Sequence, residues 1–482
     1  MFNNKIIKSW IDNKFLIIVI VFISSKIIIY QNFLQIHSGF ESYWQLAHVD
    51  LLRNDLFDTI KYLHMQPPLW NLIVGLLLKI SDGNYEFSSK IILNIHWFFS
   101  FFILLIIKYF CEEFNLNSLS KSIIYLIFIF HPSIIFFENI PYYAHSVVFL
   151  FTVMSLLIYK LQKTNKYKYE IYFYLIITIL IYLISAFVPL LLIAFFIIFR
   201  FLDNLNKQNH NFFIKFRNFI LILIIAFIPY LKNYFIFGTF TKGTWSGLQL
   251  ATTTTNLPDL TNQRVFYKCG LGLTFGDQLI KEHRDSKKKE LENYFKKYKK
   301  DPNKLNHESI IGEKSTRNHL AMISRSEWCL RKNLENINYN KIKWIKGRIN
   351  EFLLPHSQLA IDYDIIEIPN GFEKIKEIKK NLYKKKSFKR AKQIFVFVFM
   401  LLIYLVIIYK ILSHKEKSYV RSAYLFIFLV YAYIMLISSL FGNQEGQRFM
   451  HYGFIIQILF FINVFKMIEG SKLKLFKYFF RY

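Results

Sequence analysis

The stretch KIILNIHWFFSFFILLIIKYF, residues 90–110, decides the fold class of this chain. It is charged only at Lys90 and Lys108. A helix of this length reaches about 31 Å, which matches the thickness of a bilayer hydrocarbon core. Similar runs recur along the 482 residues, of which 54% are hydrophobic and only 19% charged. The chain is therefore predicted to be an all-α polytopic membrane protein.

Further apolar runs predict further crossings. The predicted spans cover residues 14–34, 90–110, 121–137, 143–161, 170–200, 217–237, 391–412, 419–440 and 452–468. The run 170–200 is too long for one crossing, because its helix would measure about 46 Å. A break at Ser185-Ala186-Phe187-Val188-Pro189 would divide it into two short crossings. The sequence thus predicts about ten transmembrane helices, within a range of roughly ten to twelve.

The basic residues predict the orientation of these helices. The formal charge is +29, and most Lys and Arg lie in short segments between apolar runs. There they set orientation and contact anionic headgroups, so membrane lipids are the expected partners and nucleic acid is not. The run Pro68–Ile80 has ~13 residues and is expected to be an interfacial or re-entrant helix, because a crossing there would export the cluster Lys160–Lys168. Both termini are then cytoplasmic, in the inner (plasma) membrane.

The hydropathy pattern divides the chain into three parts. Residues 1–237 form a transmembrane module with an outer loop over 36–90, residues 238–390 form a small external domain, and residues 391–482 form the C-terminal transmembrane helices.

The external domain is expected to be mainly helical, with helices over Asp277–Lys300 and Glu308–Leu354 and a basic amphipathic helix near 374–392 that lies on headgroups. This last helix places many lysines outside, which long translocated segments tolerate. Cys269 and Cys329 share the domain and could pair, but their spacing is not that of a zinc or redox site.

A lone carboxylate stands between aromatic residues in the outer loop. Glu41 lies in Ser38-Gly39-Phe40-Glu41-Ser42-Tyr43-Trp44, where the chain leaves the bilayer. Such a carboxylate can accept a proton from an attacking hydroxyl when its neighbours partly desolvate it. The alternative is an ordinary solvated loop acid. Asp50, Asp55 and Asp58 are other acids in the same loop.

The same loop continues to His64-Met65-Gln66-Pro67-Pro68-Leu69-Trp70. The two prolines fix an extended entry and then begin a helix, which aims His64 and Gln66 back at the loop. His37, His48 and His64 show no paired ligand spacing, so no metal site is predicted, and an interfacial histidine is the alternative interpretation.

Two later turns are also polar. Glu138 follows Phe137 at bilayer depth, where carboxylates usually face a cavity. Glu445 and Arg448 lie in the turn 442–452, where Arg448 suits a bidentate contact with phosphate or is a snorkelling arginine. Lys26, inside the first span, is interpreted as a satisfied or snorkelling lysine.

Together these segments resemble the GT-C glycosyltransferases that use polyprenyl-phosphate sugars, particularly bacterial relatives of the protein O-mannosyltransferases and of the lipid A aminoarabinose transferase. The resemblance covers about the first 240 residues and the late turn. It is carried by the acidic-aromatic loop, the Pro-Pro-Leu helix start, the turn from His131-Pro132 to Glu138, the segment PYLKNYFIFGTF at 229–240, and Glu-x-x-Arg-Phe at 445–449.

The resemblance implies a role for each candidate residue. Glu41 would be the general base on the acceptor hydroxyl, although many relatives carry an Asp-Glu pair where this chain has Phe40-Glu41. Arg448 would contact the lipid phosphate. The other substrate-binding residues would be His64, Gln66, Glu138 and Glu445.

The implied reaction is hexosyl or pentosyl transfer from a polyprenyl-phosphate donor to a glycan, lipid or protein acceptor at the outer face, with inversion. Some relatives bind a divalent metal, but its ligands are not evident here, so the cofactor stays open.

Two other classes of protein compete with this interpretation. A transporter or flippase of a lipid-linked or anionic substrate would place a charged or helix-broken site near the bilayer midplane. The polar residues of this chain lie instead at the predicted outer ends of spans, and no inverted repeat is visible. The third class is a non-catalytic envelope scaffold.

Overall fold

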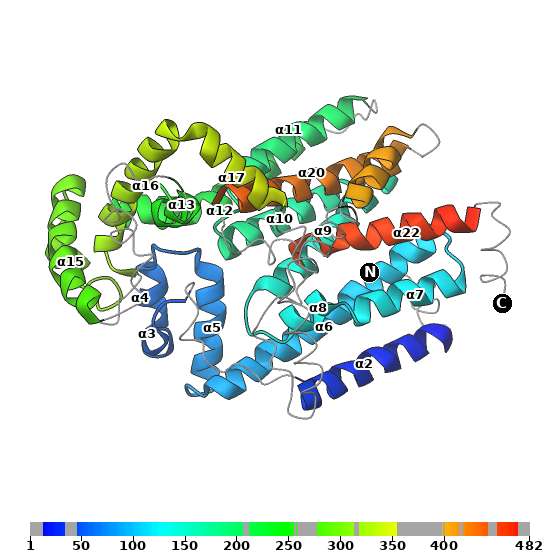
Figure 1. Cartoon of the computed structure of the whole chain (residues 1–482), viewed down its shortest axis with the longest axis horizontal. Coiled ribbons are helices and arrows are strands. Elements are labelled where there is room, and N and C mark those ends of the chain that lie inside the picture. The colour runs from blue at the N-terminus through cyan, green and yellow to red at the C-terminus, as the bar shows by residue number, and fades with distance from the viewer. Residues whose placement is uncertain are drawn as a thin grey trace.

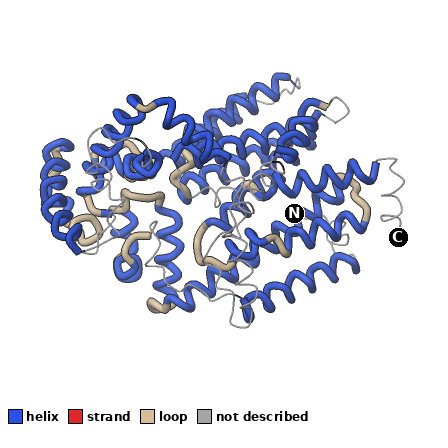
Figure 2. The backbone as a smooth tube through the Cα atoms, in the orientation of Figure 1, coloured by secondary structure: helices blue, strands red, loops and turns tan. Residues whose placement is uncertain are grey.

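The structure is a computed structural model of the whole chain. It describes residues 13–33, 46–205, 212–254, 257, 277–312, 318–353, 398, 401–413, 418–441 and 451–470. Figure 2 shows helices joined by short loops, and no strand occurs among these residues. The predicted all-α class is therefore confirmed for the described part of the chain.

A bundle of apolar helices makes up most of the molecule. Its members are α2 (Asn13–Phe33), α6 (Tyr85–Glu113), α7 (Ser118–Ile129), α9 (Ala144–Thr164), α10 (Tyr167–Leu183), α11 (Leu190–Leu205), α12 (Phe212–Phe237), Leu401–Leu412, α20 (Ser418–Phe441) and α22 (Phe454–Gly470). In Figure 1, α6, α7, α20 and α22 run in nearly the same direction. α6, α9 and α12 are each long and apolar enough to cross a membrane, and several others are shorter apolar helices. A membrane location is plausible on these grounds, while the number of crossings stays a prediction.

The outward faces of two of these helices are apolar. Ile17 and Ile20 of α2, and Leu221, Ile224 and Ile228 of α12, each expose half or more of the side chain. Within each helix they recur three or four residues apart, so they form stripes on one face. Continuous exposed apolar surface of this kind suits contact with lipid.

The long run 170–200 is interrupted where the sequence predicts a break. α10 ends at Leu183, and α11 begins at Leu190, directly after Pro189. Proline cannot donate the backbone hydrogen bond that would continue the helix. The two short helices are therefore joined by a turn.

The carbonyl oxygens of this turn are bound by a buried lysine. The Lys242 ammonium donates to the oxygens of Ile181 at 2.9 Å and Ile184 at 2.7 Å, and also to that of Phe187. Carbonyls at a helix C-terminus favour a cation because they have no intrahelical partner. Lys242 lies in the loop that follows α12, so this loop is fastened to the turn between α10 and α11.

The sequence predicts one span over 121–137, whereas the structure has two helices there. α7 ends at Ile129, and α8 (Pro132–Glu138) starts at a proline. Pro132 lacks an N–H and its ring excludes a continuing helix, so it is accommodated in a first turn. The His131 side chain caps that turn by accepting a hydrogen bond from the Ser133 N–H at 3.3 Å. The break leaves Glu138 in a short helix of its own.

Three short helices lie across one end of the bundle. They are α3 (Val49–Asn54), α4 (Leu56–Lys61) and α5 (Pro68–Ile80). In Figure 1, α5 runs across the direction of α6 and α22. The interfacial location of Pro68–Ile80 stays a prediction.

The described part of the hydrophilic segment is helical and lies beside these short helices, with α15 farthest from the bundle (Figure 1). It contains α13 (Ser246–Thr254), α15 (Asp277–Tyr298), η2 (Pro302–Leu305), α16 (Ala321–Tyr339) and α17 (Lys341–Leu353). A small core of its own is formed by Phe237, Tyr294, Leu305, Ile310, Leu320 and Ile323. The predicted helix over Asp277–Lys300 is therefore present as α15.

The helix predicted from Glu308 begins later, at Ala321. Residues 308–312 form a turn instead, in which the N–H groups of Ile310 and Ile311 both donate to the His307 oxygen. Cys329 of α16 is disulfide-bonded and Cys111 is free, while Cys269 lies outside the described residues. The predicted basic helix near 374–392 and the first part of the span 391–412 also lie outside them.

Candidate functional site

Polar side chains gather inside the bundle where α2, α6, α8 and α9 meet the segment His451–Gly453 that precedes α22. This polar cluster consists of Lys26, His96, Ser100, Glu138, His145 and His451, and each of these residues is at most 3% exposed. Such groups are costly inside an apolar bundle and are usually functional there. The cluster is the strongest candidate site in the described part of the chain.

An ion pair forms the charged centre of the cluster. The Lys26 ammonium from α2 contacts the Glu138 carboxylate at the end of α8. Lys26 is therefore a satisfied lysine, the first of the two interpretations drawn from the sequence. Both charges are nearly inaccessible to water, so each depends on the other for compensation.

Ser100 links this pair to an imidazole. The Ser100 hydroxyl donates to the second carboxylate oxygen of Glu138 at 2.8 Å and lies 2.8 Å from His145 Nε2. Since the hydroxyl hydrogen is used toward Glu138, Nε2 of His145 must be the protonated nitrogen that donates to Ser100. The other nitrogen, Nδ1, has no hydrogen-bond partner among the described residues.

Two further histidines surround His145. His96 Nδ1 lies 3.3 Å from the backbone oxygen of Glu138, and the His96 ring centroid lies 5.5 Å from that of His145. His451 stacks on the Phe137 ring at 4.3 Å and on His145 at 5.7 Å. Its Nδ1 lies 2.9 Å from the Ser133 hydroxyl.

His96 and His451 also each have one ring nitrogen, Nε2, without a hydrogen-bond partner among the described residues. The cluster therefore offers three buried, unsatisfied imidazole nitrogens beside one ion pair. Chemically it can accept or relay protons and bind a hydrogen-bonding ligand.

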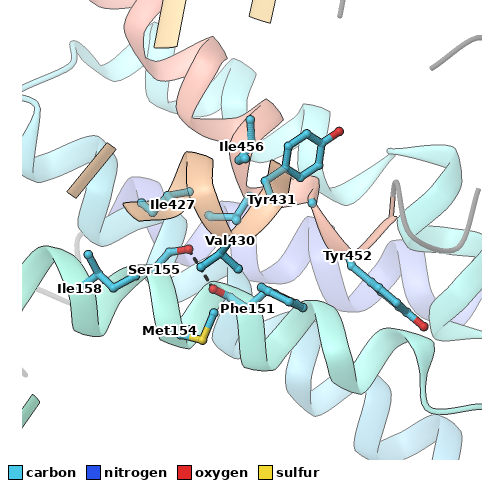
Figure 3. A pocket seen from close by; sticks show the side chains of 11 residues that line it. Phe151, Met154, Ser155, Ile158, Ile427, Val430, Tyr431, Tyr452 and Ile456 are labelled. Atoms are coloured by element: carbon cyan, nitrogen blue, oxygen red, sulfur yellow. Dashed lines mark hydrogen bonds between the residues drawn. The ribbon is translucent and has the colours of Figure 1, made fainter. Parts of the chain in front are cut away.

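An apolar pocket lies beside the cluster. Figure 3 shows it between side chains of α9 and those of α20 and α22. Its lining includes Phe151, Met154, Tyr431, Tyr452 and Gly453. Tyr452 and Gly453 directly follow His451, so the same turn contributes to the polar cluster and to the pocket wall. The free volume is about 10 Å³, which is room for one water molecule.

Gly453 is required by this packing. A Cβ atom at that position would lie 1.9 Å from Cε2 of Tyr431. The start of α22 can therefore approach α20 only without a side chain there.

His64 lies in a different place, at the junction between the outer loop and the hydrophilic segment. Its Nδ1 is 2.8 Å from the Thr244 hydroxyl, and its backbone N–H donates to Asn318 Oδ1 at 2.9 Å. Burial lowers the pKa of His64 to about 3. His64 therefore stays neutral and joins three segments of the chain. Gln66 is half-buried in the turn before α5.

One group of side chains meets the distance requirement for a metal. Among the described residues, Asp55, Asp58 and His307 bring their ligand atoms within 4.8 Å of one another. His307 Nε2 is 2.9 Å from Asp55 Oδ2, and its ring stacks on Tyr62. This contact joins the outer loop to the hydrophilic segment. Asp55 and Asp58 were noted in the sequence as alternative acids, whereas His307 was not singled out.

The predicted site residues are only partly described. Glu41, Glu445 and Arg448 lie outside the described residues. Glu138 lies in the polar cluster, while His64 and Gln66 belong to the junction near the outer loop. His96, His145 and His451 were not singled out as site residues. The available signal was a histidine inside an apolar run, since such residues are rare in membrane helices.

No family model, curated protein or solved structure matches the chain.

Proposed function

We propose that the protein is a membrane glycosyltransferase that moves a sugar from a polyprenyl-phosphate donor to a hydroxyl of a glycan, lipid or protein acceptor at the outer face. One observation carries the proposal. Glu138 of the second outer turn and His451, which ends the late turn, meet in one polar cluster beside an apolar pocket.

This arrangement suits a donor with two unlike parts. An isoprenoid tail needs apolar surface between helices, and the phosphate and sugar need polar groups at its end. The turn His451–Gly453 borders both environments. In the sequence, His451 follows the predicted phosphate-binding Arg448 by three residues. The pocket is narrow, so admitting a tail would require α20 to separate from α9 and α22.

In the proposed reaction, Glu41 and Arg448 have separate roles. The acceptor oxygen attacks the anomeric carbon while the bond between that carbon and the phosphate oxygen breaks. Glu41 takes the acceptor proton, and polyprenyl phosphate leaves with its charge compensated by Arg448. The polar cluster would position the sugar or the phosphate beside them.

The disulfide at Cys329 supports the placement of the hydrophilic segment outside the cytoplasm. Disulfides persist in oxidising compartments and are rare in the cytosol. The same compartment would then hold the outer loop, because α3, α4 and α5 adjoin this segment through the contacts of His64 and His307.

A transporter or flippase of a lipid-linked or anionic substrate is the second proposed function. It is favoured by the buried Lys26–Glu138 pair at the end of the short helix α8, since transporters place charged residues at interrupted helices.

Reconstitution in proteoliposomes tests both proposals. With polyprenyl-phosphate sugars and a labelled acceptor, the wild type should transfer sugar, and Glu41→Gln should lower turnover by roughly 10²- to 10⁴-fold, the usual contribution of a general base. Arg448→Ala should raise the donor concentration needed for half-maximal rate.

Glu86→Gln is the matched control, because Glu86 is an exposed acid paired with Lys90 on the surface of α6. Full turnover by Glu41→Gln would remove Glu41 from its role. Movement of intact lipid-linked sugar across the bilayer without transfer would favour the transporter.

A further inference from the structure

The helix α17 exposes an apolar face toward the outside of the molecule. Ile342 is 72% exposed and Ile345 is 50% exposed, and Tyr339 just before the helix is 74% exposed. Ile342 and Ile345 are three residues apart and therefore lie on one face of α17. In a soluble domain such residues would be expected to face the core.

The neighbouring face of α17 is bonded to the protein. Trp344 Nε1 donates to the Thr253 hydroxyl at 3.3 Å, and the Arg348 guanidinium donates to the Thr253 backbone oxygen at 3.2 Å. Trp344 and Arg348 are four residues apart and share a face. These bonds fix the rotation of α17 about its axis and so keep the isoleucines exposed.

Lysines border the exposed face. At about 100° per residue, Lys341 and Lys346 fall on either side of Ile342 and Ile345, and Lys343 lies farther round. All three lysines are exposed, and none is ion-paired with a described residue. The nearby acids of α16 are occupied, since Glu335 pairs with Lys332 and Glu327 with Lys297. The border of the apolar face is thus positively charged.

The position of α17 beside an apolar helix of the bundle is consistent with a place near the bilayer. α17 packs against α20 as well as α13 and α16. Figure 1 shows it at the end of α20 that lies toward the hydrophilic helices. The part Tyr419–Tyr433 of α20 is an apolar helix of the bundle. If α20 spans the bilayer, as the sequence predicts, a helix beside its end would lie near the lipid headgroups.

We propose that α17 is an in-plane membrane helix that inserts Ile342 and Ile345 among the acyl chains and binds anionic phospholipid headgroups through Lys341, Lys343 and Lys346. An apolar stripe bordered by lysines is the pattern of helices that lie in the interface. Each lysine near an anionic surface contributes about fivefold to the attraction. The proposal is independent of which reaction or transport the protein performs.

Depth measurement by spin labelling tests it in the full chain. A nitroxide at Ile345→Cys, in a Cys111→Ser background, is placed in phosphatidylcholine vesicles with or without phosphatidylglycerol. Collisions with lipid-soluble oxygen should exceed collisions with an aqueous nickel chelate, and the difference should grow with phosphatidylglycerol. A label at Lys289→Cys on α15, an exposed residue of the same segment, should report water in both.

Reversing the charges with K341E/K343E/K346E should remove the effect of phosphatidylglycerol while the isoleucines are unchanged. A label at Ile345 that reports water as strongly as the one at Lys289 would overturn the proposal. So would dipolar coupling between Ile345 labels of two copies, which would show that a second molecule covers the face.

Discussion

At the scale of single residues, the pair Lys26–Glu138 joins α2 to α8 through charges that water does not reach. Removing such charges from water costs several kcal/mol for each ion, and their mutual attraction offsets that cost only while both are present. The two residues are therefore expected to behave as a unit.

Glu138→Gln should destabilise the protein by about 3–5 kcal/mol, because it leaves the Lys26 ammonium without its counter-charge. The double variant K26M/E138Q should recover most of that loss. Thermal unfolding in detergent measures both. Equal losses in the single and double variants would show that the charges do not depend on each other.

His64 gives a second prediction at this scale, for pH. Its folded pKa of about 3 lies below the ordinary value of 6.5. Below pH 6.5 the unfolded chain therefore binds a proton that the folded chain does not, and stability falls as pH falls from 6.5 toward 3. At pH 5 the loss is about 2 kcal/mol, from roughly 1.5 pH units at ~1.36 kcal/mol each.

The measurement is the unfolding midpoint against pH for the wild type and His64→Gln. The variant should lose this part of the acid dependence, whatever its stability at neutral pH. An unchanged slope in His64→Gln would contradict the assignment.

At the scale of elements, α13 and α16 approach each other through a glycine. A Cβ atom at Gly247 would lie 1.8 Å from the Ser326 oxygen, which is backbone and cannot turn aside. The Gly247 N–H also donates to the Ser326 hydroxyl at 3.1 Å. The close packing of these two helices therefore depends on the absence of a side chain.

Gly247→Ala should destabilise the hydrophilic helices by about 1–3 kcal/mol, since the added methyl forces the helices apart. Gly347→Ala is the matched control: it lies inside α17 with no atom within 4 Å of its added Cβ. There alanine should stabilise the helix by up to ~1 kcal/mol. Unfolding of both variants, followed by helical circular dichroism, checks the opposite signs.

At the scale of the whole molecule, the predicted orientation places the two ends of the bundle in different compartments. In intact cells, Lys289→Cys on α15 should react with a membrane-impermeant maleimide. Lys166→Cys, exposed between α9 and α10, should react only after permeabilisation. Reaction of both before permeabilisation, or of Lys166→Cys alone, would reverse or rule out the topology drawn from the positive-inside rule.

The sequence predicts the helices of this molecule better than it predicts the contacts between them. Hydropathy finds α6, α9 and α12, and Pro189 marks the turn after α10, because these signals are local. Hydropathy does not detect the helix break before Pro132, because the apolar run continues through it. The contact of His145 with His451 joins residues that are far apart in sequence, and no local pattern contains it.

The contact of Lys242 with the carbonyls between α10 and α11 gives the molecule a mechanical coupling. Lys242 lies in the loop that leads from α12 into the hydrophilic helices. A force on those helices would therefore be transmitted through Lys242 to the turn between α10 and α11. A displacement of the hydrophilic helices would move the turn between α10 and α11 with them, so the two parts would move together.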